Sequence, residues 1–295
     1  TLTTSGTGGV NLTGNNLLGT LAGSGTIGAL TFNNAQSLAL GSITSNAAMS
    51  ISTTGATSNI TLGTLNNTGA GFAITLNAGT LITTSAAASL TTNNGALTLY
   101  ANDSIVFANA ITINTNGGAI TLNADRDGSG VGAIALTGSS LNSGGGAITL
   151  GGGSGIISAG TGYAAGTATY QDGIMIFGGT VNAGGGNIIM NGRSAVTTTA
   201  FISGVNFDSA ANVTTTSNGT ITINGLGNTG TGTSNRGIRI ANGGAISSQH
   251  GAIILNGTGG GTGTAASTFG VFLGGTGGFV STSGGGNMTI TGNGG

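Results

Sequence analysis

The chain of 295 residues is most unusual for what it lacks. It contains no cysteine, proline or tryptophan, and its charged residues, five acidic and four basic, make up only 3% of the total. The acidic residues are all Asp and the basic ones all Arg, so strong helix formers such as Glu and Lys are missing and we expect almost no helix. A net charge of −1 offers no basic surface for nucleic acid or anionic lipid, so we expect neither partner.

Targeting and membrane signals are missing as well. No apolar run approaches the roughly 18 residues of a membrane helix, so we expect no membrane insertion. The first residues, Thr1–Thr4, carry no basic region of a signal peptide, and we expect the chain to be an interior segment of a longer protein. The absence of cysteine is consistent with an exported bacterial protein that stays unfolded until it has crossed a membrane.

Glycine and alternating apolar residues take the place of what is missing. Glycine accounts for 64 residues, and hydrophobic residues, at 37%, are too frequent for a typical disordered tract. Apolar residues alternate with polar or small ones in segments such as Ile111–Ile113, Ile174–Ile176 and Ile221–Ile223, bounded by Gly or Asn. This period of two indicates strands with one buried face.

The strand pattern repeats along the chain in two forms. Over residues 1–94 an apolar-Gly-polar-apolar motif recurs every 22 residues, as Leu18–Leu21, Leu40–Ile43 and Leu62–Leu65. Over residues 95–295 the spacing widens to coils of 28–40 residues with loop insertions. The first apolar positions of these later repeats are Leu97, Ile120, Ile148, Ile188, Ile221, Ile253 and Met288.

Each later repeat holds two further short strands, for example Ile238–Ile240 and the segment around Ile246. A unit this small cannot bury its own apolar residues and must stack on its neighbours. We therefore predict an all-β fold, a right-handed parallel β-helix with three short strands per coil and about ten or eleven coils.

These coils resemble a known family. The Gly-Gly-x-Ile-x-Leu coils, the insert from Leu122 to Gly130 and the Ser/Asn-Ser-Gly-Gly-Gly turns are similar to the repeat regions of filamentous-haemagglutinin-like exoproteins, which Gram-negative bacteria export by two-partner secretion. The resemblance covers most of the chain from about Gly95. It implies a right-handed shaft, an outer-membrane secretion partner, a secreted or cell-surface location, and a role in adhesion, biofilm or contact-dependent toxin delivery.

One corner of the predicted stack could bind a metal ion. Asp125 and Asp127 lie in an Asp-Arg-Asp-Gly-Ser-Gly turn, and alignment of Leu99 with Leu122 brings Asp103 beside them. Three carboxylates at one corner could hold calcium, although Arg126 could equally neutralise them in a solvated turn. No other cofactor is expected.

Catalytic groups are sparse in this sequence. The single histidine, His250, lies in a turn with no residue that marks a nucleophile or an oxyanion site, so we expect no catalytic residues. An alternative is a carbohydrate-active β-helix enzyme, which would need Asp and Arg clustered on one face of the rod. Candidate ligand-binding residues are Tyr163 and Tyr170 in the longest insertion, and Arg236 and Arg239, which could hold an anionic sugar.

The outward residues of the first strand of each coil define a flat, uncharged face. Its members include Thr121, Thr149, Ile189, Thr222 and Ile254. Such a face could pack against another rod, since few charges oppose contact, or, more remotely, bind ice. From the sequence we expect a non-catalytic shaft segment of a secreted, fibre-forming adhesin, whose partners are copies of itself and a receptor or glycan on a host or neighbouring cell.

Overall fold

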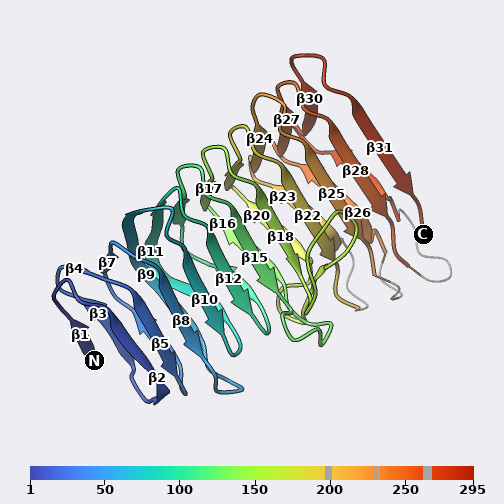
Figure 1. Ribbon diagram of the computed structural model, residues 1–295. Coiled ribbons are helices and arrows are strands. Elements are labelled where there is room, and N and C mark those ends of the chain that lie inside the picture. Colours follow the sequence, from blue (N-terminus) through green and yellow to red (C-terminus); the bar gives the residue numbers. More distant parts are fainter. Residues whose placement is uncertain (197–200, 229, 231–232, 262–267) are drawn as a thin grey trace.

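The computed structural model of the chain describes residues 1–196, 201–228, 230, 233–261 and 268–295. The described residues form a parallel β-helix without any helix: a rod with the two termini at opposite ends (Figure 1). Three columns of parallel strands run along the rod, so each coil contributes three strands, as the sequence predicts.

The first strand column forms one sheet with eleven strands along its path. Its strands are β2 (Val10–Asn16), β5 (Leu30–Asn34), β8 (Met49–Thr53), β10 (Ile74–Ala78), β12 (Leu97–Ala101), β15 (Ile120–Ala124), β18 (Ile148–Gly152), β22 (Ile188–Arg193), β25 (Ile221–Leu226), β28 (Ile253–Thr258) and β31 (Met288–Asn293). The short strand β19 (Ala164–Ala165), from the longest insertion, pairs with the end of β22.

The second strand column begins the other sheet. Its strands are β1 (Leu2–Thr4), β3 (Thr20–Gly23), β6 (Leu38–Leu40), β9 (Ile60–Ala70), β11 (Ile82–Asn93), β13 (Ile105–Phe107), β16 (Ile134–Thr137), β20 (Ile174–Phe177), β23 (Ser203–Asp208), β26 (Arg236–Ala241) and β29 (Val271–Gly274). The strands β9 and β11 are long enough to run on into the third column.

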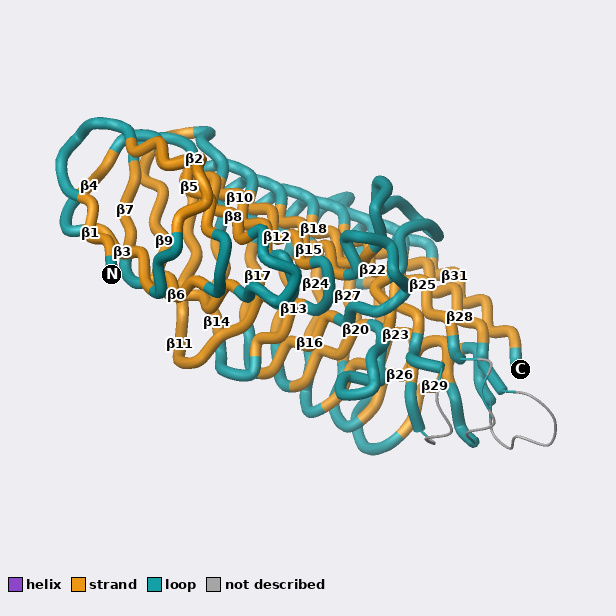
Figure 2. Tube along the Cα trace, turned by 90° about the horizontal axis from the view of Figure 1, so that it is seen from below, coloured by secondary structure: helices purple, strands orange, loops and turns teal. Residues whose placement is uncertain are grey.

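The third strand column belongs to the same sheet as the second. Apart from the ends of β9 and β11, it contains β4 (Thr26–Ile27), β7 (Ile43–Ser45), β14 (Ile111–Asn114), β17 (Ser140–Asn142), β21 (Thr180–Asn182), β24 (Asn212–Thr215), β27 (Ala245–Ser248) and β30 (Phe279–Thr282). Figure 2 shows the strands stacked along the rod, with the connecting loops between them.

Strand register agrees with the sequence repeat over the wider coils and departs from it near the start. Ile120, Ile148, Ile188, Ile221 and Ile253 pair in succession, as the spacing predicts. In the first coils, however, Leu21 pairs with Leu40, a step of 19 residues, whereas Ile43 pairs with Leu65, a step of 22. The expectation of a uniform 22-residue coil is therefore wrong at the first step, because the motif recurs in the sequence without occupying the same position in the coil.

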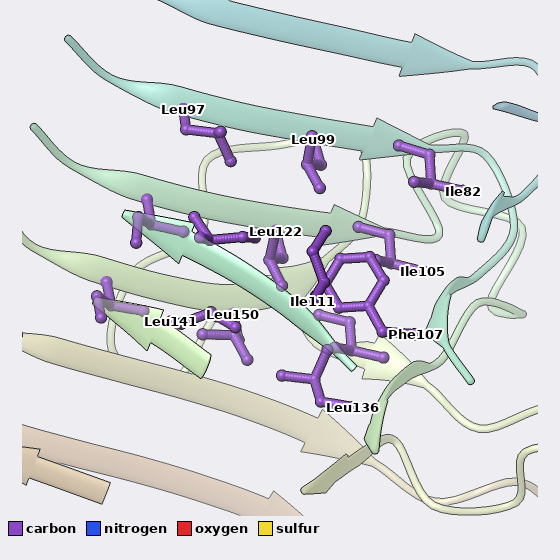
Figure 3. Packing of buried hydrophobic residues seen from close by; sticks show 14 of the residues in the cluster. Ile82, Leu97, Leu99, Ile105, Phe107, Ile111, Leu122, Leu136, Leu141 and Leu150 are labelled. Atoms are coloured by element: carbon purple, nitrogen blue, oxygen red, sulfur yellow. The ribbon is translucent and has the colours of Figure 1, made fainter. Parts of the chain in front are cut away.

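The core is a continuous apolar column inside the coils. Alternate residues of each strand point inward, so that Leu97, Leu99, Leu122 and Leu150 are fully buried and meet Ile105, Phe107 and Leu136 from the opposite sheet (Figure 3). Like residues stack on like because each coil presents the same side chain at the same position to the coil above and below. A Leu or Ile buried in this way contributes about 1.5–3 kcal/mol.

A column of glycines explains the Gly-x-Ile signature. At Gly146 an added Cβ would lie 2.3 Å from the carbonyl oxygen of Gly118, and at Gly118 it would lie 2.1 Å from that of Gly95. Neither distance leaves room for a side chain, so only glycine permits one coil to approach the next here. The column contains Gly95, Gly118, Gly146, Gly186, Gly219, Gly251 and Gly286, each two residues before a first-strand anchor.

Candidate functional site

Four of the charged side chains gather on the outward face of the second strand column. Strand pairing places Met175, Asn206, Arg239 and Phe272 in one outward row, with Asp208 beside it on β23. At the start of these strands Ser203 pairs with Arg236, both of them buried, and Asp172 lies against Ser203. We call Asp172, Asp208, Arg236 and Arg239 the charged cluster.

Hydrogen bonds link the cluster across three coils. The Ser203 N–H donates to Oδ1 of Asp172 at 2.6 Å, and Nδ2 of Asn206 donates to Oδ2 of Asp172 at 2.8 Å. Arg239 Nη1 donates to Oδ1 of Asn206 at 2.9 Å and forms an ion pair with Asp208. Asn206 therefore connects Asp172 to the Arg239–Asp208 pair.

The two carboxyl groups have opposite pKa shifts. Burial raises the pKa of Asp172 to about 6, and this outweighs the lowering effect of the hydrogen bonds from Asn206 and Ser203 and of the charge of Arg239. Burial also acts to raise the pKa of Asp208, but hydrogen bonds from Arg239 and Asn242 and the charge of Arg239 outweigh it and hold that pKa below its usual value.

Arg236 has quite different surroundings from Arg239. Its side chain is buried, only 7% exposed, and its guanidinium carbon lies 4.2 Å from the ring centre of Phe272 and 5.7 Å from that of Phe201. Within the described part of the chain its buried Nε has no hydrogen-bond partner and no carboxylate forms an ion pair with it. Burial and the charge of Arg239 lower the pKa of Arg236, against the opposing charge of Asp172.

Two open pockets lie along this face and share Phe201. One, of about 330 Å³, is lined by Asp172, Tyr170, Met175 and Phe201. The other, of about 420 Å³, is lined by Phe201, Asn206, Asp208, Arg236, Arg239 and Phe272. Three ligand-binding candidates from the sequence, Tyr170, Arg236 and Arg239, therefore lie at these neighbouring pockets.

The fourth candidate, Tyr163, is placed apart from them. It lies half-buried in the insertion before β19 and lines neither pocket, and burial raises its pKa. The sequence pattern does not single out Asp172 or Asp208 as ligand-binding candidates. The sequence does hold a signal for Asp208. If Ile174–Ile176 is aligned with Val205–Phe207, Asp208 falls beside Phe177 on the same strand column.

The expected cluster of three carboxylates does not form. Asp103 and Asp125 are adjacent, since the Asp125 N–H donates to the Asp103 carbonyl oxygen at 2.9 Å. The Asp125 carboxylate, however, accepts hydrogen bonds from Ser129 Oγ and from the N–H groups of Gly130 and Val131. Across the described ranges no three His, Cys, Asp or Glu side chains are placed to hold a metal ion. Asp125 instead organises its own turn, and calcium binding at this corner gains no support.

The remaining candidates lie where the repeat places them. Thr121, Thr149, Ile189, Thr222 and Ile254 form one partly exposed row along the first sheet, although its packing role stays a prediction. His250 Nδ1 lies 3.0 Å from the carbonyl oxygen of Gly284 in an exposed turn. None of the described residues forms a helix long and apolar enough to cross a lipid bilayer.

No family model, no curated protein and no solved structure matches the chain.

Proposed function

We propose that the chain is a non-catalytic shaft segment of a secreted bacterial exoprotein of the filamentous-haemagglutinin-like kind, which builds an extracellular fibre or holds binding loops away from the cell. One observation carries this proposal: the three strand columns run without interruption along the rod, and a continuous buried core lies beneath them from Leu21 to Leu255. A stack of this kind transmits shape over distance, because each coil contacts only its neighbours.

The partners follow from the same proposal. An outer-membrane secretion partner exports the chain to the surface of a Gram-negative cell, and the partly exposed row from Thr121 to Ile254 packs against a second rod. Receptor or glycan contacts fall to the loops and pockets of the wider coils, which alone carry charge.

Electron microscopy of the protein isolated from its native source tests the shaft. We expect rods or filaments whose axial repeat is about 4.8 Å per coil, with eleven coils spanning on the order of 50 Å. Surface labelling of intact cells with an antibody to this segment, with and without external protease, locates it. Compact particles, or label that resists external protease, would contradict the proposal.

A second candidate is a carbohydrate-active β-helix enzyme, and the charged cluster favours it. Asp172 and Asp208 lie on one face with pKa values moved in opposite directions, the pattern by which one carboxyl serves as acid and another as base. The shaft remains the better proposal because both oxygens of each carboxylate already accept hydrogen bonds, and Asp208 is paired with Arg239.

Turnover separates the two candidates. Acidic and neutral polysaccharides, with and without calcium, are incubated with the native chain and with Asp172→Asn and Asp208→Asn. We expect no product from any of them. Product formation that both substitutions abolish would establish the enzyme instead, and Asp127→Asn, an exposed turn carboxylate, serves as the matched control.

A further inference from the structure

We propose that the pocket between Phe201 and Phe272 binds the carboxylate of an acidic saccharide, with the Arg236 guanidinium as its anchor. The inference goes beyond the shaft role and does not depend on it, since it stands on the surroundings of Arg236 and on the two neighbouring pockets.

The burial of Arg236 without a paired carboxylate, in the portion of the chain that the structure describes, is the first argument for an anionic ligand. A guanidinium remains charged at neutral pH, and burying it costs free energy unless a counter-charge or hydrogen bonds compensate. Here two aromatic rings supply part of the compensation, at 4.2 and 5.7 Å, while Nε is buried without a partner in the described residues. Arg236 also lines the open pocket, so an anion from solvent can supply the missing counter-charge.

The neighbouring charges limit the anion to a single negative charge. Asp208 and Arg239 neutralise one another. Asp172 lies close enough to Arg236 for its charge to raise the pKa of that guanidinium, and it adds a negative charge to the site as it ionises. A dianion such as phosphate would be repelled by these carboxylates, whereas a carboxylate matches both the planar fork of a guanidinium and the available charge.

The strand arrangement favours a saccharide over an acidic peptide. An extended peptide gains affinity by adding to a free sheet edge. The pocket instead lies on a sheet face, where β23 and β26 are each paired on both sides, so the backbone of a bound peptide would find few partners. Sugar hydroxyl groups can donate to the remaining lone pairs of the Asp172 carboxylate in the adjoining pocket.

The two pockets together fit more than one sugar residue. They share Phe201, which is 66% exposed, and both follow the outward row from Met175 to Phe272 along the rod axis. A uronic acid bound at Arg236 therefore places the neighbouring sugar of the oligosaccharide beside Asp172 and Tyr170. The ligand is best matched by a short linear oligosaccharide that contains uronic acid.

Isothermal titration calorimetry with a uronate tetrasaccharide tests the proposal. The comparison ligands are the same tetrasaccharide with its carboxyl groups reduced to alcohols, and sodium sulfate. We expect the uronate form to bind at least tenfold more tightly than either. If the reduced form bound as tightly as the uronate form, the anchor role of Arg236 would be overturned. If sulfate bound as tightly, the assignment of a saccharide ligand would be overturned. An absence of binding at millimolar concentration would overturn both.

Matched variants assign the effect to Arg236. Arg236→Met preserves an apolar stem between the rings and should weaken uronate binding at least tenfold. Arg126→Met is the control, because Arg126 likewise lies over an aromatic ring, 5.0 Å from that of Tyr100, but outside this pocket. It should change affinity less than twofold. Unchanged binding by Arg236→Met would overturn the proposal.

A measurement on the unaltered chain covers the case in which Arg236→Met fails to fold. The Nε–H resonance of Arg236, identified by its absence from an Arg236→Lys sample, should shift on titration with the uronate tetrasaccharide. The corresponding resonance of Arg126 should stay in place. No shift at Arg236 under saturating ligand would overturn the proposal.

Discussion

The first 94 residues and the remaining 201 form the same stack but differ in what they offer to a ligand. The short coils contain no charged residue and no histidine, whereas all five Asp, all four Arg and His250 lie after residue 94. The core is alike in both, with fully buried Ile60 and Leu65 in the first part and Ile188 and Ile221 in the second. The comparison teaches that stacking alone builds the rod, and that charged side chains are added only in the later coils.

The largest expected effect tests whether both parts share one packing rule. At Gly63, in the short coils, an added Cβ would lie 2.0 Å from the Leu40 carbonyl oxygen, and at Gly251, in the wide coils, 1.8 Å from that of Gly219. Substitution of either glycine by Ala should destabilise the fold by about 3 kcal/mol or more, since backbone must move. Urea unfolding followed by circular dichroism measures this.

The matched control is Gly155→Ala, because nothing lies within 4 Å of a Cβ at that position. We expect it to change stability by no more than about 0.5 kcal/mol. If Gly63→Ala lowered stability as little as Gly155→Ala does, the short coils would not depend on glycine for close approach in the way the wide coils do.

The next effect belongs to the wide coils. Asn224 Nδ2 donates to Asn191 Oδ1 at 2.7 Å, and Asn256 Nδ2 donates to Asn224 Oδ1 at 2.9 Å, in a ladder across three coils. Asn224→Ala removes both hydrogen bonds and leaves the buried Asn191 Oδ1 with only the longer bond from the Gly160 N–H, at 3.4 Å, so it should cost about 1–3 kcal/mol in urea unfolding. Asn218→Ala, at an exposed turn, is the control and should be nearly neutral. Equal effects would show that the ladder adds no stability.

A smaller effect depends on pH and on the charged cluster. Because the folded state raises the pKa of Asp172 from 3.8 to about 6, it binds more protons than the unfolded state between these pH values. Stability should therefore be highest below about pH 4 as far as Asp172 is concerned, and fall by about 1–2 kcal/mol as pH rises through 6.

Urea unfolding at intervals from pH 4 to pH 7 measures this slope, and Asp172→Asn should flatten it. Asp208 has a lowered pKa, so its own contribution is present above its ordinary pKa of 3.8 and is lost at lower pH. A slope that survives in Asp172→Asn would assign the titration to another group.

The smallest expected effect concerns the outward row of the first sheet. Ile189 points away from the core, so Ile189→Thr should alter stability by less than about 0.5 kcal/mol. If the row packs rod against rod, the same change should reduce lateral association in sedimentation velocity. Thr31→Ser, on the outward face of the short coils, is the control. Association that is indifferent to Ile189→Thr would remove this face from the proposed fibre contact.

Much of the fold could be predicted from the residues, and most of the site could not. The anchors from Leu97 to Met288 pair as their spacing predicts, because inward apolar side chains are repeated in every coil. The sequence marks Arg236 and Arg239 as candidates but carries no sign of their different surroundings. Arg239 meets Asp208 from 31 residues away, and Arg236 meets Phe272 in the next coil.

The sequence by itself determined the stacked coils, the buried columns and the glycines that permit close approach, since these depend on a local pattern that every coil repeats. The tertiary structure alone decided which of the few charges meet, and that the three carboxylates near Asp125 do not. The physical reason is that stacking energy is periodic and recorded in each repeat. A contact between charges in different coils instead depends on the path of insertions whose lengths vary.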